Sequence, residues 1–194
     1  MENIVMHNLK WAVSALLLRF PDSSLSCIET GTIRSHTEKH NSTLHISESL
    51  HTRGKLTSVD INPGSICISK DVCSKCSNIS WVQSDSLAYL RKQTNKFHFA
   101  FLDSVNNRDH IFEEFKLVVP QMIPGGIIIV DDAGVTPAGE ELVGVLPEKG
   151  RKVSKFLLSL GCENFVRTSS HGTQLWIDME TSLIEKMQAK FAVS

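Results

Sequence analysis

Two adjacent carboxylates, Asp131 and Asp132, directly follow an apolar segment, 127–130. A run of this kind is typical of a strand that is buried on both faces of a parallel sheet. A second apolar segment, 97–102, is followed by another carboxylate, Asp103. Ligands of such sheets bind beyond the carboxyl ends of the strands. These acidic side chains are therefore placed to bind a hard cation or to serve as an acid or a base.

The ends of earlier predicted strands carry residues that suit a nucleoside ligand. Segment 29–32, Glu-Thr-Gly-Thr, has a single glycine, whereas a loop that binds a pyrophosphate needs more, so a dinucleotide is disfavoured. Asp60 can accept hydrogen bonds from both hydroxyls of a ribose, or it can cap the helix that follows. Asp85 and Ser86 can likewise lie near a base or cap the next helix.

The elements that would position these residues alternate along the chain. Strands are expected at 26–29, 55–60, 79–83, 97–103, 126–131, 164–168 and 173–177. Helices are expected at 4–19, 41–51, 62–76, 84–92, 108–119, 149–160 and at the C-terminus. This alternation predicts an α/β protein with right-handed crossovers and a doubly wound, mostly parallel, seven-stranded sheet. The last strand pair is joined by a turn too short for a crossover, so it should form an antiparallel hairpin.

The composition limits the organisation and the partners of the protein. A chain of 194 residues suits one domain, here an N-terminal helix (1–22), a core (25–178) and a C-terminal helix (179–194). The net charge of -1 gives no general attraction to nucleic acid or to an anionic membrane. The apolar stretch 11–18 is too short to span a bilayer. Five cysteines, an odd number, favour free thiols in a reducing compartment, which predicts a cytoplasmic protein.

The element order and the strand-end residues resemble those of class I S-adenosylmethionine-dependent methyltransferases. The resemblance covers about 25–178, and segment 29–32 matches the family's acid-x-Gly-x-Gly motif with its second glycine replaced. It implies a Rossmann-like methyltransferase fold and S-adenosylmethionine as the cofactor. It also implies a set of cofactor-binding residues at the strand ends: Glu29, Thr30, Gly31, Thr32, Asp60, Ile61, Asp85, Ser86 and Asp103.

The acids after the fourth and fifth strands resemble those of metal-dependent O-methyltransferases of the catechol, sugar and macrolide types. The resemblance implies a divalent cation, Mg²⁺, and a set of residues that both ligate it and take part in catalysis: Asp103, Asp131 and Asp132. Such a cation would lower the pKa of a hydroxyl on a small-molecule or sugar acceptor. Catechol-type enzymes have a lysine base three residues after the strand-four aspartate, where this chain has Asn106. The candidate bases that remain are Asp132, His110 and His98.

Other interpretations of the same residues remain. The strand-end acids could cap helices without a metal, and the chain could be a binding or scaffold protein with a degenerate methyltransferase fold. A nicotinamide oxidoreductase and a metal-dependent hydroxylase-like relative are further alternatives. A loop with several Gly and Pro residues, 133–147, is expected to close over a small-molecule acceptor. No membrane or nucleic-acid partner is expected, and a homodimer is left open.

Overall fold

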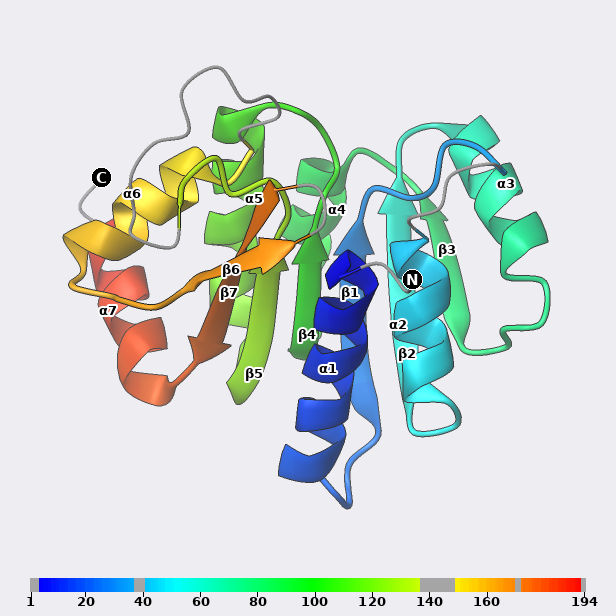
Figure 1. Ribbon diagram of the computed structural model, residues 1–194, viewed down its shortest axis with the longest axis horizontal. Coiled ribbons are helices and arrows are strands. Elements are labelled where there is room, and N and C mark those ends of the chain that lie inside the picture. The colour runs from blue at the N-terminus through cyan, green and yellow to red at the C-terminus, as the bar shows by residue number, and fades with distance from the viewer. Residues whose placement is uncertain (1–3, 37–40, 137–148, 170–171, 193–194) are drawn as a thin grey trace.

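A single seven-stranded sheet organises the protein, with strand order β3-β2-β1-β4-β5-β7-β6 (Figure 1). The computed structural model describes residues 4–36, 41–136, 149–169 and 172–192. Only β7 runs against its neighbours, because it pairs antiparallel with both β5 and β6. The predicted doubly wound sheet with a C-terminal antiparallel hairpin is thus confirmed. The strands are β1 (Leu25–Thr30), β2 (Gly54–Asp60), β3 (Ile79–Gln83), β4 (Phe97–Leu102), β5 (Met122–Val130), β6 (Val166–Ser169) and β7 (Gly172–Met179).

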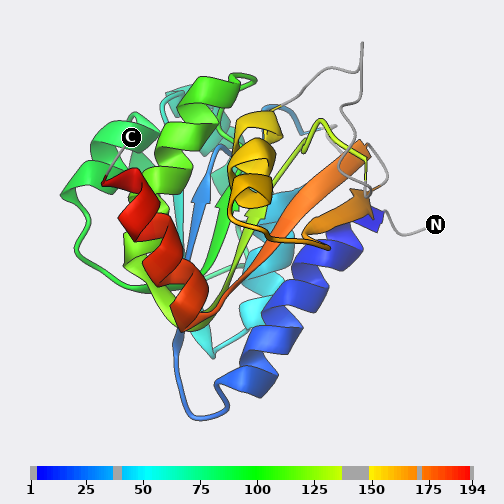
Figure 2. The ribbon, with the colours of Figure 1, turned by 90° about the vertical axis from the view of Figure 1, so that its left-hand side faces the viewer.

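Helices cover both faces of the sheet. Figure 2 shows α1 on the opposite side of the sheet from α5 and α7. Helix α2 packs beside α1, whereas α4 and α6 pack beside α5. The helices are α1 (Ile4–Arg19), α2 (Ser42–Leu50), α3 (Pro63–Val72), α4 (Ser86–Lys92), α5 (Arg108–Val118), α6 (Arg151–Ser159) and α7 (Thr181–Phe191), with a short 3₁₀ turn at Val119–Gln121.

Two apolar clusters hold the layers together. One lies between the sheet and α1 and α2, and it includes Leu16, Leu50 and Phe101. The other lies between the sheet and α4, α5, α6 and α7, and it includes Phe115 and Ile128. Every residue of β4 is buried, as expected for a central strand with helices on both faces. The sheet is therefore a rigid base for the loops that follow its strands.

Three predicted boundaries were wrong in informative ways. Strand β5 begins at Met122, so the Pro-Gly-Gly sequence at 124–126 lies inside the strand and does not form a separate turn. A register shift between Phe97 and Phe99 accompanies this stretch in the pairing of β4 with β5. Helix α3 ends at Val72, earlier than expected, and α4 begins two residues late because Asp85 caps it from outside.

The structure also places the cysteines, His98 and the start of the expected lid. All the cysteines are free thiols, Cys73 and Cys76 included. His98 is a buried histidine whose Nδ1 accepts a hydrogen bond from the Ser26 backbone amide. The first residues of the expected lid, Ala133 and Val135, are buried in the core, and 137–148 lie outside the described residues. Within the described parts of the chain, no helix is both long and apolar enough to cross a membrane.

Candidate functional site

A cavity of about 230 Å³ opens at the carboxyl ends of β1, β2 and β3, beside the loop that follows β4. Its lining contains most of the predicted cofactor residues. It is formed by Gly31, Val59, Asp60, Ile61, Ser84, Asp85, Ser86, Ser104, Val105 and His110. Ile61 and Val105 are exposed, by 67% and 40%, and give this pocket apolar walls beside its carboxylates. We call this cavity the strand-end pocket.

Gly31 shapes the strand-end pocket through its backbone. Its φ of +87° lies in the left-handed region that favours glycine. A Cβ at this position would lie 2.4 Å from the carbonyl oxygen of Asp103. The turn after β1 can therefore pass directly against the end of β4 only because residue 31 has no side chain.

Asp60 and Asp85 each have a structural role as well as a place in the pocket wall. The Oδ2 atom of Asp60 accepts hydrogen bonds from the backbone amide and the hydroxyl of Thr32, at 2.9 and 3.0 Å. Its Oδ1 atom accepts from the Asn62 amide at 2.7 Å. Asp85 caps α4 by accepting from the Ala88 amide at 2.8 Å. Both carboxylates are thus held in fixed orientations at the pocket, where Asp85 caps a helix and Asp60 holds the turns after β1 and β2.

Glu29 and Thr30, which the resemblance implies are cofactor-binding residues, do not line the strand-end pocket. Both side chains are fully buried. The Glu29 carboxylate accepts hydrogen bonds from the hydroxyls of Ser42, Thr43 and Ser58. Burial raises the pKa of Glu29 to about 7, although these hydroxyls oppose the shift. This carboxylate therefore joins β1, α2 and β2.

A histidine that the sequence offered only as a candidate base forms part of the pocket wall. His110 Nε2 lies 3.0 Å from the Ser86 hydroxyl and 3.4 Å from Oε1 of Glu114. Glu114 is fully buried, and its Oε2 accepts from the hydroxyl of Thr30 at 3.0 Å. The hydrogen bond with Glu114 raises the pKa of His110, while burial opposes it. Both contacts are made by the same ring nitrogen, Nε2. His110 therefore does not pass a proton from Ser86 to Glu114 through its two nitrogens, and we assign it a structural role in the pocket wall.

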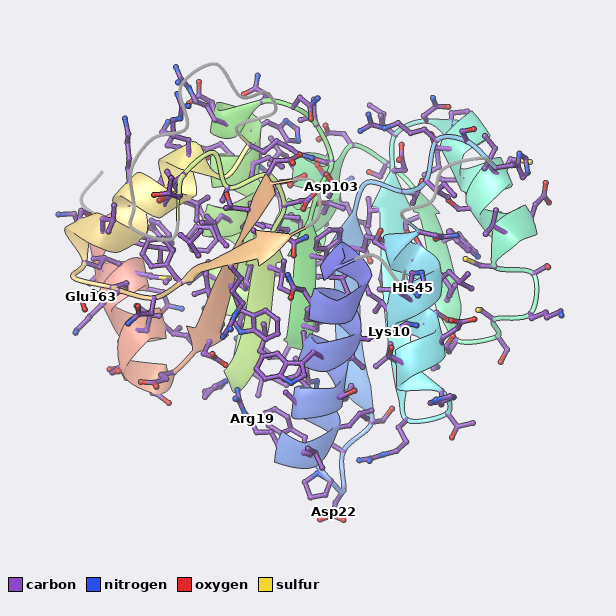
Figure 3. All side chains as sticks on the ribbon, viewed as in Figure 1. Lys10, Arg19, Asp22, His45, Asp103 and Glu163 are labelled. Atoms are coloured by element: carbon purple, nitrogen blue, oxygen red, sulfur yellow. The ribbon has the colours of Figure 1, made fainter. Side chains whose placement is uncertain are left out.

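Next to the pocket, the predicted acidic cluster forms as expected at the ends of β4 and β5. Asp103, Asp131 and Asp132 each offer an oxygen atom, and these atoms lie within 4.8 Å of one another. Figure 3 shows Asp103 at the upper edge of the sheet, on the side where the strands end. Asp132 has a φ of +49°, an uncommon conformation outside glycine. The sharp bend that follows β5 directs its carboxylate to the same place as the other two.

A lysine that the sequence analysis did not single out, Lys149, lies among these acids. The Nζ atom of Lys149 is 2.9 Å from Asp132 Oδ2 and forms a second, shorter ion pair with Asp103 Oδ1. Only 4% of the lysine side chain is exposed. Burial lowers the pKa of Lys149, but the surrounding carboxylates outweigh it and the net direction is upward. The buried ammonium is therefore charged.

The remaining carboxylate has an amide partner. Gln174 on β7 is buried, and its Nε2 donates to Asp131 Oδ1 at 2.7 Å. Its Oε1 accepts from the side-chain amide of Asn8 on α1 at 3.1 Å.

Desolvation and the charge of Asp131 raise the pKa of Asp103 above its usual range, against the effect of the lysine, although 32% of the Asp103 side chain still reaches solvent. One ammonium cannot neutralise three neighbouring carboxylates, so the pKa of Asp103 rises.

The donor set can be compared with the needs of Mg²⁺. Carboxylate oxygens are the right ligand type for a hard cation. However, the Lys149 ammonium already lies between Asp103 and Asp132, and Asp131 already accepts from Gln174. A divalent ion at this place would meet a fixed positive charge. The arrangement of these residues does not fit a divalent cation.

Comparisons with known proteins agree with this architecture. No protein-family model matches the sequence, and no curated protein matches it significantly. Among solved structures, the Streptomyces achromogenes O-methyltransferase TomG, bound to S-adenosylmethionine, is 16% identical, with a TM-score of 0.60 over 87% of this chain and 79% of TomG.

Two further structures extend the comparison. A Bacillus cereus O-methyltransferase bound to S-adenosylhomocysteine is 16% identical, with a TM-score of 0.58 over 86% of this chain and 79% of its own. A Clostridium thermocellum protein described as an rRNA-methylase is 9% identical, with a TM-score of 0.64 over 93% of this chain and 98% of its own. At these identities the likeness shows the fold. The chain has the fold of class I S-adenosylmethionine-dependent methyltransferases.

Proposed function

We propose that this protein transfers a methyl group from S-adenosylmethionine to a hydroxyl oxygen of a small molecule or sugar. The observation that carries the proposal is that the strand-end pocket and the acidic cluster are in direct contact. Gly31 lines the pocket, and its backbone lies against that of Asp103 in the cluster. A cofactor held in the pocket would therefore have its reactive end close to groups that can orient an acceptor.

The charges of the pocket suit this cofactor. S-adenosylmethionine carries a sulfonium and an amine, which are positive, and adenosine hydroxyls that donate hydrogen bonds. Asp60 is assigned to the ribose, and Asp85 and Ser86 to the side of the adenine. Gly31 and Ile61 complete the wall. Thr32 acts indirectly, by holding one oxygen of Asp60.

The acceptor is assigned to the acidic cluster. Asp103, Asp131 and Asp132 are the groups that would take the acceptor's proton as the methyl group arrives. The solved relative TomG is an O-methyltransferase of tomaymycin synthesis, which is in keeping with a small-molecule acceptor. The free cysteines are in keeping with a reducing location such as the cytoplasm.

Calorimetry with S-adenosylhomocysteine tests the cofactor assignment. We expect saturable binding with one site per chain, and Asp60→Ala should weaken it. An absence of binding at about 1 mM ligand, an affinity of only about 4 kcal/mol, would overturn the proposal. Reduced nicotinamide cofactor serves as the matched alternative ligand, since the fold class contains both types of binder.

Activity separates an enzyme from a binding protein with the same fold. The protein is incubated with methyl-labelled S-adenosylmethionine and a pool of hydroxylated small molecules and sugars. Label that enters the pool with the wild type, but not with Asp131→Asn, supports the transferase. Tight cofactor binding without label transfer to any pool would favour the binding protein.

A further inference from the structure

The acidic cluster contains its own cation. The Lys149 side chain reaches the place where three carboxylate oxygens converge, and it pairs with Asp103 and Asp132. It is almost completely buried, whereas the neighbouring Lys152 is 46% exposed and pairs with Asp109 at the surface. The fold thus selects one of two nearby lysines for the interior of the site.

The backbone around Lys149 is built to hold it there. The next residue, Gly150, donates its amide to the carbonyl oxygen of Asp132 at 2.9 Å. A Cβ at Gly150 would lie 2.9 Å from the Cα of Ala133, so only glycine allows this approach. Helix α6 starts directly afterwards, at Arg151. The start of α6 is therefore fixed against the end of β5, which places residue 149 over the acids.

The charge balance then disfavours a metal. A buried carboxylate is stable only when it is paired, and the ammonium supplies a partner to two of the three acids. A divalent ion would have to displace the lysine or share a poorly solvated space with it. Like charges at such short range repel strongly when water is excluded.

We propose that Lys149 is a built-in replacement for the divalent cation of related O-methyltransferases, and that this protein works without a metal. The inference depends on the proposed function for its catalytic meaning. Lys149 holds Asp103 and Asp132 in place and also faces the acceptor. An ammonium has three N–H donors, one more than these two contacts use. The further donor can hold the oxygen of the acceptor.

The methyl transfer balances without a metal. The acceptor oxygen forms a bond to the methyl carbon while the bond between that carbon and the sulfur breaks. The sulfonium becomes a neutral thioether, S-adenosylhomocysteine. The hydroxyl proton passes to a carboxylate of the cluster and from there to solvent. Lys149 stays protonated throughout and stabilises the negative charge that develops on the acceptor oxygen.

Manganese binding tests the inference directly, because free Mn²⁺ gives an electron paramagnetic resonance signal that is lost on binding. The wild type is titrated with Mn²⁺ alone, beside Lys149→Ala and Lys152→Ala. We expect no saturable site in the wild type or in Lys152→Ala. Lys149→Ala should bind Mn²⁺ at least about tenfold more tightly, because the carboxylates lose their internal counter-charge. Adding Asp131→Asn to Lys149→Ala should remove this new site.

The outcomes are decisive in both directions. Saturable Mn²⁺ binding by the wild type at one ion per chain would overturn the inference. So would equal affinity in the wild type and in Lys149→Ala. If Lys149→Ala does not fold, the wild-type titration alone decides, and Lys149→Arg, which keeps the charge, should bind no Mn²⁺.

The proposed function is tested separately in the same samples. Binding of S-adenosylhomocysteine to the wild type is measured in a chelator. We expect it to be unchanged, since the strand-end pocket contains no group that needs a metal. An absence of this binding would overturn the methyltransferase proposal. The Mn²⁺ titrations would still test independently whether Lys149 excludes a divalent cation.

Discussion

Glu29 lies at the end of β1 in the segment that matches the cofactor motif, yet its carboxylate is buried beneath the pocket. Replacing it with glutamine keeps the size of the side chain and removes the charge. We expect the variant to keep its affinity for S-adenosylhomocysteine within about threefold, because no cofactor contact is lost. We also expect its stability to depend on pH differently from that of the wild type.

The magnitude follows from the shifted pKa. Burial raises the pKa of Glu29 from its ordinary value of 4.5 to about 7 in the folded protein. The folded state therefore binds this proton more tightly than the unfolded chain, and the wild type loses stability as the pH rises from 4.5 through about 7. Each pH unit in that window costs about 1.4 kcal/mol, so the loss totals about 3 kcal/mol. Glutamine cannot ionise and avoids the loss.

Urea denaturation followed by tryptophan fluorescence measures the effect at pH values from 4.5 to 8. The unfolding free energy of Glu29→Gln minus that of the wild type should rise by about 3 kcal/mol across this range. The rise is separate from any constant offset caused by altered hydrogen bonds. Glu163→Gln, on an exposed side chain (Figure 3), controls for the loss of a carboxylate as such. A difference that stays flat with pH would refute the reasoning, and a tenfold loss of cofactor affinity would return Glu29 to the pocket.

Three further predictions concern the strand-end pocket. Asp60→Ala should weaken S-adenosylhomocysteine binding by roughly 10- to 100-fold, the scale of a lost charged hydrogen bond of about 1.5–3 kcal/mol; unchanged affinity in calorimetry would remove Asp60 from the ribose. Gly31→Ala should cost roughly 2–5 kcal/mol of stability, from the left-handed backbone and the contact with Asp103. Gly161→Ala, also at positive φ but with nothing within 4 Å, should cost clearly less in the same urea titration. Because the pKa of His110 is raised in the folded protein, the wild type gains stability below pH 6.5 and loses it as the pH rises through that raised pKa. His110→Gln should lack this pH-dependent contribution; identical pH profiles of the unfolding free energy would contradict this.

The fold was predictable because its signals are local and repeat along the chain. The apolar runs of β4 and β5 and the short link between β6 and β7 predict the sheet and its reversed last strand. Boundaries were less accurate where competing signals met. Pro124 and two glycines indicate a turn, but the structure accommodates them as an irregularity inside β5, where Gly125 has a φ of +85° and the register with β4 shifts.

The candidate site was predictable only in part. Asp60 is the last residue of β2 and Asp85 lies just after β3, so the sheet alone brings them to one edge. Lys149 lies 46 residues after Asp103, and its position depends on the close packing of Gly150 against Ala133. Neither hydrophobic pattern nor motif spacing encodes such a contact. Glu29 shows the reverse problem, since a motif match does not reveal which way a side chain faces.

The contact between Asn8 and Gln174 gives the first helix a role beyond packing. A glutamine amide can rotate and exchange its two ends, and only one end is compatible with a neighbouring carboxylate. By donating to Oε1, Asn8 keeps the NH₂ group turned toward Asp131. The orientation of the Gln174 amide beside the acidic cluster is thus set by a residue 166 positions away in the sequence. Replacing Asn8 with alanine would therefore leave the Gln174 amide free to rotate, while the buried apolar residues of α1 that support the fold stay in place.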